Sequence, residues 1–535
     1  MINQQCSLGA VKAYDAWSLW DIENGDMPGD ENVLLASVDS GVQWDHPDLV
    51  DNIWQNLGED ADGDGKTIEY INDEWVLDPG DINGVDDDGN TYTDDLIGWD
   101  PSGISGGDDN DPNTQVHSHG THVAGTLAAA TNNGIGVASA AFNSSILPVK
   151  CTRDNNDEET INDGYPGIQY AAKAGYYLGC QDCNPGTIGN PGDESPTFAI
   201  IQNSWGNYGF PSTYEQTVIN TAHQLYGAVV LASAGNDNED LDINDHYPSD
   251  YDNVINVAAV SCNGNKASFS NYGSAVDIAA PGVGIMSTVI DGYESYDGTS
   301  MAGPNAASCI GLLASFHPEM DNDEIIERIL NTADDFIYDG MNENYQDNFG
   351  NRDLGHGMVD CFKAVGFDII PNLSYSFQDL LPLDGDGDSN VNPGESAELG
   401  IYLYNEEGWT DATNVVGVLS CDNPGINIIN NTYNYGDIAA GGFGEHFENL
   451  FTFSISDDIQ VGDVEFTLNI TADGPGNYSL DKDIKFPVSI NLNQQNWPQD
   501  FNQVQSSPLI MDIDMDGDIE IAFGDYDGFL HVMNS

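Results

Sequence analysis

The strongest constraint on the fold is an alternation of short apolar segments with longer helical patterns through the first two-thirds of the chain. The apolar segments do not alternate strictly with polar residues, which is typical of strands buried on both faces of a parallel sheet. They span 33–39, 146–151, 198–203, 228–233 and 254–260. Helical patterns span 121–131, 167–177, 214–226, 301–317 and 323–332. The alternation predicts an α/β fold, with a mostly parallel sheet covered by helices on both faces.

The alternation ends near residue 367, and the remaining sequence predicts further parts of a different kind. We expect an α/β domain over 1–367 and a linker over 368–375. Residues 376–492 combine strand patterns with Gly, Asn and Asp turns, which indicates an all-β sandwich. Residues 493–535 contain one strand-rich repeat that resembles an FG-GAP/VCBS repeat. Because a single propeller blade cannot bury its own faces, we expect this last part to be truncated.

The charge of the chain excludes several classes of partner. Acidic residues number 89 against 11 basic ones, so the formal net charge is −78. Such a surface cannot neutralise phosphates, which excludes nucleic acid, and an anionic membrane surface repels it. The sequence has no apolar run of about 18 residues, so no membrane span is expected. The acidity fits adaptation to salt, which screens like charges, and it equally fits an ordinary acidic secreted protein.

The eight cysteines are too sparse for a disulfide-built scaffold at this length. Cys180 and Cys183 form a C-x-x-C pair, but the sequence offers no second pair to complete a zinc site. A local disulfide and two free thiols both remain open for this pair.

Three separated segments carry residues suited to acyl transfer. Asp39 ends a predicted strand in VLLASVDSGVQWDHPDL, His119 precedes a helix in HSHGTHVAGT, and Ser300 begins one in DGTSMAGPNAAS. This chemistry needs a nucleophilic hydroxyl, an imidazole that takes its proton, and a carboxylate that orients the imidazole. Taken singly, Ser300 could be a helix N-cap, Asp39 a turn residue and His119 a surface histidine. Strand ends and helix starts meet at one sheet edge, so we expect the three to converge.

Seven sequence blocks in order resemble the subtilisin-like serine proteases, the subtilases, of the long bacterial type with C-terminal β domains. The blocks are VDSGVQWDHPDL, HGTHVAGTLAA, NSWG, ASAGND, ASFSNYG, IAAPGVGI and GTSMAGP. The resemblance implies that Asp39 orients the imidazole, His119 is the general base and Ser300 is the nucleophile. It implies that Asn236 helps to bind the oxyanion. The segment formed by Ser204, Trp205 and Gly206 would bind the substrate backbone and line the first specificity pocket.

The resemblance further implies a secreted serine endopeptidase that acts on protein or peptide substrates, with structural calcium and no organic cofactor. A propeptide is expected in the precursor, and none is visible in this chain. The alternatives are a catalytically silent adhesion or binding module and an unmatured fragment. His122 should be structural. Gly303 and Asn305 depart from the common family pattern of Ser and His, and 58–112 is a long insertion relative to short bacterial subtilisins.

Asp-rich turns predict calcium sites, because hard cations take several oxygens from a short loop. One loop has the 1, 3, 5, 7, 12 spacing of an EF-hand but Ser389 at position 6, and its candidate ligands are Asp384, Asp386, Asp388, Asn390 and Glu395. A second resembles the calcium turn of propeller repeats, with Asp512, Asp514, Asp516, Asp518 and Glu520. A third resembles a loop of long bacterial subtilases, with Asp86, Asp88 and Asn90.

By the same resemblance to subtilases, Asp48 and Asn133 match ligands of a subtilase calcium site. The turn at 60–66 has a similar composition, and a solvated acidic turn is the alternative for every loop.

Overall fold

A computed structural model describes most of the chain and divides it into two compact units, Met1–Gly366 and Phe367–Ser535. The described residues are 5–22, 25–103, 107–154, 160–177, 198–346, 352–383, 390–474, 479–491, 504, 507–513, 520–525 and 529–534.

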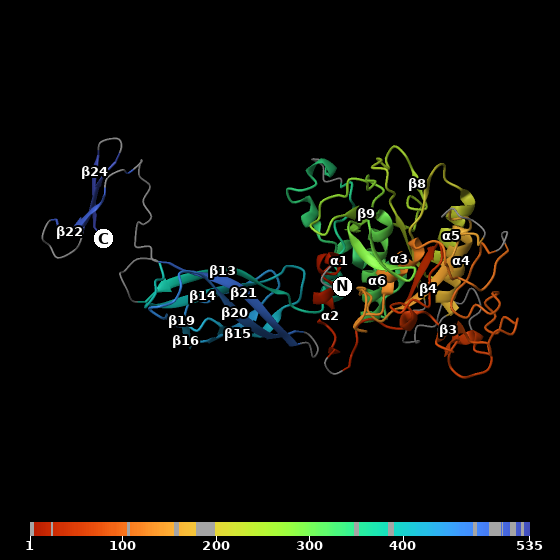
Figure 1. The fold of residues 1–535 in the computed structure, drawn as a ribbon, viewed down its shortest axis with the longest axis horizontal. Helices are drawn as coiled ribbons and strands as arrows, with labels where there is room; N and C mark the ends of the chain where they lie inside the picture. The colour runs from red at the N-terminus through yellow and green to blue at the C-terminus, as the bar shows by residue number, and fades with distance from the viewer. Residues whose placement is uncertain are drawn as a thin grey trace. The chain divides into compact units, whose positions relative to one another are not determined.

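The first unit is built on a parallel sheet of six strands in the order β10-β9-β7-β5-β1-β4. Figure 1 labels β9 and β4 of this sheet. The strands are β1 (Leu34–Asp39), β4 (Ser145–Lys150), β5 (Ala199–Asn203), β7 (Val229–Ser233), β9 (Ile255–Val260) and β10 (Ile278–Pro281). Every residue in these strands is buried. The predicted α/β fold with a parallel sheet is confirmed, and five of the six strands lie within a residue of the predicted ranges.

Helices cover both faces of this sheet. Successive side chains of a strand point to opposite faces, so neighbouring residues pack into two different apolar cores. Leu35 packs in the core that contains α3 (His119–Ala128) and α6 (Thr299–Phe316). Leu34 points the other way, into the core with α4 (Gly164–Tyr177) and α5 (Thr213–Gln224). The remaining helices are α1 (Cys6–Ala10), α2 (Ala13–Trp17), α7 (Asn322–Asn331) and α8 (Cys361–Gly366). None of the helices in the described part of the chain is long and apolar enough to cross a bilayer.

The loops of the first unit contain short strands and 3-10 turns. Antiparallel hairpins pair β2 (Ile68–Ile71) with β3 (Glu74–Leu77) and β11 (Ile285–Val289) with β12 (Gly292–Tyr296), and β6 (Asn207–Tyr208) pairs with β8 (His246–Tyr247). The 3-10 turns are η3 (Val50–Asn52), η4 (Leu57–Glu59), η6 (Asp335–Tyr338) and η7 (Glu343–Tyr345). The hairpin β2–β3 belongs to the insertion at 58–112.

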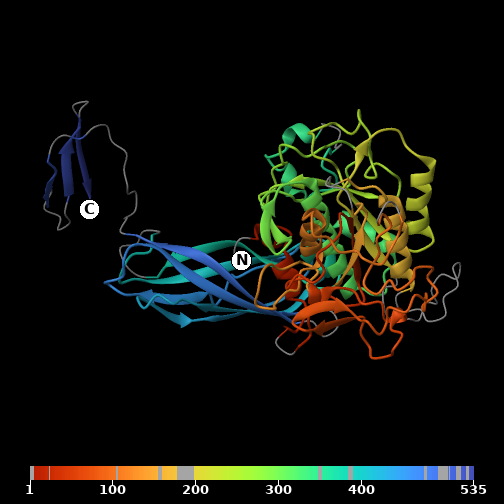
Figure 2. The same ribbon diagram turned by 45° about the vertical axis from the view of Figure 1, so that its right-hand side comes forward.

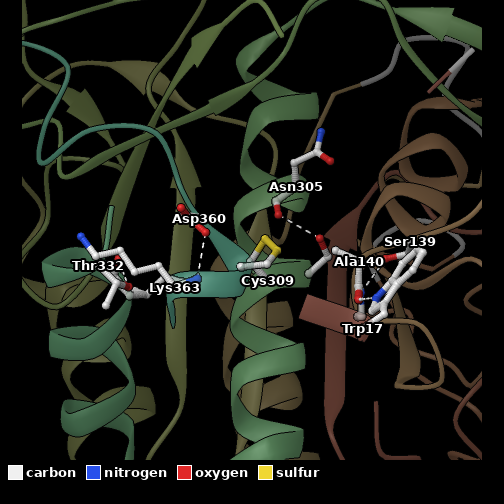
Figure 3. Close-up of a disulfide and its surroundings, with 12 residues drawn as sticks. Trp17, Ser139, Ala140, Asn305, Cys309, Thr332, Asp360 and Lys363 are labelled. Carbon is white, nitrogen blue, oxygen red and sulfur yellow. Dashed lines mark hydrogen bonds between the residues drawn. A yellow bond between two sulfur atoms is a disulfide. The ribbon is translucent and has the colours of Figure 1, made fainter. Parts of the chain in front are cut away.

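Two disulfides tie distant parts of the first unit together. Cys6 pairs with Cys262 across 256 residues, and Cys309 on α6 pairs with Cys361 at the start of α8 (Figure 3). A cross-link of this kind stabilises a fold mainly by restricting the unfolded chain. Cys180 and Cys183 lie outside the described residues, so their state stays open.

The second unit consists of antiparallel sheets. One contains β13 (Leu373–Pro382), β14 (Ser396–Asn405), β16 (Ile426–Asn430), β18 (Phe443–Gly444) and β19 (Phe451–Ile455). Another contains β15 (Ala412–Ser420), β17 (Thr432–Ile438), β20 (Gly462–Asp473) and β21 (Ser479–Ile490). Both contribute to one apolar core, in which Phe453 and Phe466 lie 5.1 Å apart between ring centroids. Figure 2 shows these two layers in a second view. A three-stranded sheet contains β22 (Leu509–Met511), β23 (Glu520–Gly524) and β24 (Leu530–Asn534).

The predicted end of the linker over 368–375 is wrong, because β13 already begins at Leu373. Leu373 is fully buried in the core of the second unit and pairs with Asn405 of β14. Tyr375 stacks on Phe486 at 5.6 Å. From Asn372 onward, the apolar residues Leu373, Tyr375 and Phe377 alternate with polar ones, which is the pattern of a half-buried strand, and the sequence interpretation overlooked that period.

Candidate active site

The predicted catalytic residues lie where strands end and helices begin. Asp39 is the last residue of β1, Ser204 follows β5 directly, and Asn236 lies three residues beyond β7. His119 and Ser300 occupy the first turns of α3 and α6. Because β1, β5 and β7 are parallel neighbours, their carboxyl ends share one edge of the sheet. We call this region the catalytic edge.

Asp39 and His119 form a hydrogen-bonded pair at this edge. The Nδ1 of His119 lies 2.8 Å from Oδ1 of Asp39, which also accepts the backbone N–H of Ser40 at 2.7 Å. The Asp39 side chain is only 1% exposed, while that of His119 is 25% exposed. Gly120 permits the close approach of α3, because a Cβ there would lie 2.3 Å from the carbonyl oxygen of Gly41. A buried carboxylate therefore fixes an imidazole whose ring still reaches solvent.

Ser300 is fixed by a reciprocal contact with Ser204. The Oγ of Ser300 donates to the carbonyl oxygen of Ser204 at 3.2 Å, and the Oγ of Ser204 donates to the carbonyl oxygen of Ser300 at 2.9 Å. Pro304 explains the second bond. It lies four residues after Ser300 and has no N–H, so the carbonyl of Ser300 lacks its normal helical donor. The hydroxyl of Ser204 replaces that donor and joins β5 to the start of α6.

Asn236 is oriented so that its amide N–H groups face the start of α6. Its Oδ1 accepts the backbone N–H of Thr299 at 2.9 Å and the Thr299 hydroxyl at 3.0 Å. A Cβ built on Gly298 would lie 3.6 Å from the backbone nitrogen of Ser300 and 3.8 Å from Nδ2 of Asn236. Two N–H donors thus border the space next to Gly298, and the first N–H groups of a helix have no partner within the helix. Such an arrangement can stabilise negative charge on an oxygen.

The segment Ser204–Gly206 is held in place at both ends. The indole N–H of Trp205 donates to the carbonyl of Val38 at 2.9 Å. Gly206 has no space for a side chain, because a Cβ would lie 2.2 Å from Cε1 of His246. His246 is buried, its Nδ1 lies 2.9 Å from the Ser249 hydroxyl, and burial lowers its pKa to about 4. The ring is therefore neutral near pH 7 and acts as packing behind the segment.

His122, the second histidine of the H-G-T-H motif, has structural contacts. Its Nε2 lies 3.0 Å from the carbonyl of Ile285 and 3.2 Å from that of Glu294, on the two strands of the β11–β12 hairpin. The ring stacks on Tyr296 at 4.3 Å. Burial, together with nearby His119, lowers the pKa of His122 to about 4. His122 therefore joins α3 to this hairpin as a neutral ring.

The structure adds Gln202 to the residues that position Ser300. Its Nε2 donates to the Ser204 hydroxyl at 3.0 Å, and a Cβ at position 303 would lie 2.2 Å from the same nitrogen. Gly303, a departure from the family pattern, thus leaves the space that Gln202 occupies. Asn305, the other departure, donates to the carbonyl of Pro281 at 2.9 Å and joins α6 to β10. Sequence reasoning missed Gln202, although the two polar residues that end the otherwise apolar strand AIIQN, Gln202 and Asn203, were an available signal.

The structure brings Asp48 and Asn133 together, as the resemblance implied. The Nδ2 of Asn133 donates to one oxygen of the fully buried Asp48 at 2.8 Å, and the backbone N–H of Val137 donates to the other at 2.7 Å. Burial raises the pKa of Asp48. The Tyr293 hydroxyl also hydrogen-bonds to Asp48. The side-chain oxygens of Asp48 and Asn133 are of the kind that suits a hard cation.

The loop with Asp86, Asp88 and Asn90 folds around its own backbone. Asp86 accepts the N–H of Gly89 at 2.8 Å, and Asp88 accepts the N–H of Asn90 at 2.8 Å. Single oxygens of Asp88, Glu59 and Asp95 lie within 4.8 Å of one another. Burial, with the charge of Asp88 close by, raises the pKa of Asp95 well above its usual range. This set of oxygens also suits a hard cation.

The two C-terminal loops are described only in part. Glu395 is buried and accepts the N–H of Asn392 at 2.8 Å, and Asn390 lies in the same loop. Glu520 is buried and accepts the N–H of Ile513 at 2.6 Å, while Asp512 is at the near end of that loop. The other predicted ligands lie outside the described residues: Asp384, Asp386, Asp388, Asp514, Asp516 and Asp518.

Comparison with known proteins gives the family of the chain. The sequence profile described as "Subtilase family" matches residues 30–357, which contain the whole catalytic edge. The chain belongs to the subtilase family.

Several curated proteases are similar to this subtilase. A thermophilic serine proteinase of Bacillus sp. strain AK1 is 33% identical over 324 residues, covering 59% of each chain. An extracellular protease of Xanthomonas campestris is 32% identical, covering 62% of this chain and 52% of that protein. Thermitase of Thermoactinomyces vulgaris is 34% identical, covering 65% of this chain and 92% of that protein. The chain therefore spans only 52–59% of the length of the first two relatives.

Proposed function

We propose that this subtilase is a secreted, calcium-stabilised serine endopeptidase in which Asp39, His119 and Ser300 form the catalytic triad. The observation that carries the proposal is the 2.8 Å hydrogen bond between His119 and the buried Asp39, at the sheet edge where Ser300 lies in the first turn of α6. Membership of the subtilase family supports it, as do relatives named as serine proteinases.

The proposed reaction follows the general serine-protease scheme. The Oγ of Ser300 attacks the scissile carbonyl carbon, and its proton passes to Nε2 of His119. The negative charge of Asp39 stabilises the resulting imidazolium through Nδ1. The C–N bond then breaks as the same proton passes to the leaving amine, and an acyl-enzyme remains on Ser300. Water, deprotonated by His119, releases the acid and restores the hydroxyl.

The tetrahedral intermediate needs donors for its oxyanion. The Nδ2 of Asn236 and the backbone N–H of Ser300 are the proposed pair, since both border the space next to Gly298. Asn236 cannot easily present its oxygen there, because that oxygen already accepts two hydrogen bonds from Thr299. Donors fixed before the reaction need no reorganisation when charge develops on the substrate.

Protein or peptide substrates would lie along Ser204–Gly206. This segment leaves the end of β5 and is held by Trp205 and by the lack of space at Gly206. An extended substrate backbone can add to such a fixed segment as a further strand. The net charge of −78 argues against nucleic acid as a second substrate.

Calcium and secretion complete the proposal. The oxygens of Asp48 and Asn133, the 86–95 loop and the two C-terminal loops would hold the ions, and bound calcium supplies positive charge among these carboxylates. Relatives named as extracellular proteases support secretion. The propeptide stays an expectation for the precursor.

A fluorophosphonate probe tests the proposed triad directly. The purified chain is treated with the probe in calcium and analysed by intact mass. We expect one adduct per chain, which Ser300→Ala abolishes and Ser308→Ala retains; Ser308 is a matched control because it lies on the same helix. The two chains are also assayed on a peptide amide. Absence of an adduct in the folded parent chain would support the catalytically silent alternative and overturn the proposal.

A further inference from the structure

Residues 60–81 of the insertion bring aspartates together from two directions. The turn DADGDGK folds back on Asp60, whose two oxygens accept the N–H groups of Gly63 and Gly65, each at 2.8 Å. Both glycines have a positive φ, 79° and 88°, which this tight turn requires. Single oxygens of Asp60, Asp62 and Asp64 consequently lie within 4.8 Å of one another.

Two further aspartates reach this turn from beyond the β2–β3 hairpin. Asp78 follows β3, and one of its oxygens lies within 4.8 Å of an oxygen of Asp64. A Cβ on Gly80 would lie 2.4 Å from Oδ2 of Asp62 and 3.1 Å from Oδ1 of Asp78, so these carboxylates border the same glycine. Asp81 is fixed to the turn, because its Oδ1 accepts the N–H groups of residues 61 and 62 at 2.9 and 3.3 Å. We call Asp60, Asp62, Asp64, Asp78 and Asp81 the 60–81 carboxylate cluster.

Asp78 and Asp81 each bury an oxygen that has no donor. Asp78 is 3% exposed and Asp81 is fully buried. The Oδ2 atom of each is inaccessible to solvent and accepts no hydrogen bond from the described residues. A buried carboxylate oxygen without a partner is costly, and native proteins normally satisfy it with a donor, a water or an ion. Asx turns and backbone N–H groups account for the other oxygens of these residues but leave these two atoms unsatisfied.

Lys66 neutralises only the exposed side of the cluster. Its Nζ lies 3.1 Å from Asp64 and also pairs with Glu69, and all three side chains are partly exposed. Among the ion pairs of the described residues, none involves Asp62, Asp78 or Asp81. Like charges at this separation repel one another strongly when water is excluded. The buried side of the cluster therefore has negative charge that no described cation balances.

We propose that the 60–81 carboxylate cluster binds one calcium ion, with Asp78 and Asp81 contributing their unsatisfied oxygens. Calcium takes six to eight oxygen ligands in flexible geometry, which suits carboxylates that converge from a turn and a hairpin. Magnesium requires a smaller, near-octahedral shell and retains several waters, so it fits a set of carboxylates that converge from two segments less well. This site is separate from the 86–95 loop and does not depend on the proposed catalytic residues.

Counting bound ions tests the proposal. The full chain with Ser300→Ala, which prevents self-cleavage, is stripped with chelator and titrated with calcium chloride by calorimetry. We expect Asp78→Asn/Asp81→Asn to bind one calcium ion fewer per chain than its parent. Asp73→Asn is the matched control, because it removes one exposed carboxylate from the turn of the same hairpin and should leave the count unchanged. The same titration with magnesium chloride should give no difference between the parent and the double variant.

Thermal unfolding separates an ion site from a purely structural role. In chelator the double variant should melt at or above the temperature of its parent, because asparagine removes the repulsion. Calcium should raise the melting temperature of the parent more than that of the variant. An equal calcium count in both chains overturns the proposal, and so does an equal loss of stability with and without calcium. If the double variant does not fold, Asp78→Asn and Asp81→Asn are measured singly against the same two criteria.

Discussion

The catalytic edge and the insertion at 58–112 both bury charged side chains, but they balance those charges differently. At the catalytic edge, Asp39 ends a strand of six buried residues and pairs with His119. Ser300 is held by Ser204 at the start of a helix in which every residue from Thr299 to Ala314 is buried. The apolar core of the sheet therefore sets this geometry.

In its described residues, the insertion contains the short β2–β3 hairpin and little apolar core of its own. Backbone N–H groups hold some of its buried carboxylates, as in Glu59, which accepts those of residues 87, 88 and 94. Polar side chains hold others, such as Asp95, which accepts the Tyr170 hydroxyl, and Asp100, which pairs with Lys150. Burial raises the pKa of Glu59 to about 7, and the charge of Asp88 adds to this shift. The comparison indicates that packing organises one region and charge balance the other. Mutations and ions should consequently affect the two regions separately.

Asp39→Asn should have the largest effect and should act on catalysis alone. Asparagine keeps the shape of the side chain but cannot stabilise the imidazolium, so we expect kcat to fall about 10⁴-fold, as in the equivalent change in trypsin-like proteases. The calcium count and the melting temperature in calcium should stay close to those of the parent. Asp51→Asn, which changes an exposed aspartate in η3, is the control for charge. A fall in kcat of less than tenfold would break the assignment of Asp39.

Asn236→Ala should lower kcat by about 10²–10³-fold with little change in KM, because the lost donor acts on the oxyanion and not on bound substrate. This figure is known from the corresponding asparagine of subtilisin. Both constants are measured on a peptide amide, with the exposed Asn244→Ala as control. A rise in KM with kcat unchanged would instead indicate a binding role for Asn236.

The sequence was sufficient to predict the catalytic edge because its residues stand in contiguous blocks at strand ends and helix starts. Once the strand around Val38 and the helix after His119 are recognised, a parallel sheet brings their ends together. The link between Cys6 and Cys262 was not predictable, since 256 residues separate them and no local pattern records the pairing. Gln202 was missed because its partner, the hydroxyl of Ser204, is defined only when β5 meets α6.

For the insertion at 58–112, the sequence predicted the acidic composition but not which carboxylates come together. The turn at 60–66 is visibly acidic, but Asp78 and Asp81 stand outside it and reach it only through the β2–β3 hairpin. Which carboxylates lose solvent depends on that tertiary contact, and composition does not encode it. The triad roles and the calcium ligands therefore stay predictions, while the family and the parallel sheet are established.

Acid should weaken the catalytic edge through His246. Burial lowers its pKa to about 4, against about 6.5 in an unfolded chain. The neutral His246 ring contributes fully to the free energy of unfolding above pH 6.5. This contribution is lost as the pH falls toward 4, because the histidine of the unfolded chain takes up a proton first. The loss is at most about 3 kcal/mol. His246→Gln should flatten the stability between pH 7 and pH 4.5 in denaturant unfolding, whereas the exposed His356→Gln should not. Parallel curves for parent and His246→Gln would show that other groups cause the acid sensitivity.

Trypsin offers the most local test of the insertion, since Lys66 is the single Lys or Arg between residues 58 and 112. In the Ser300→Ala background, cleavage after Lys66 should be slower in calcium than in chelator. The protection should reach about 100-fold when calcium is at 100 times its dissociation constant, because cleavage follows the population of the opened turn. Mass spectrometry of the fragments gives the rate of cleavage at this bond.

In Asp78→Asn/Asp81→Asn, the rate of cleavage after Lys66 should depend much less on calcium. Fluorophosphonate labelling of the same double variant with Ser300 intact should be retained. Equal calcium protection in parent and variant would mean that another ion site holds this turn, and the contrast between the two regions would then rest on the 86–95 loop.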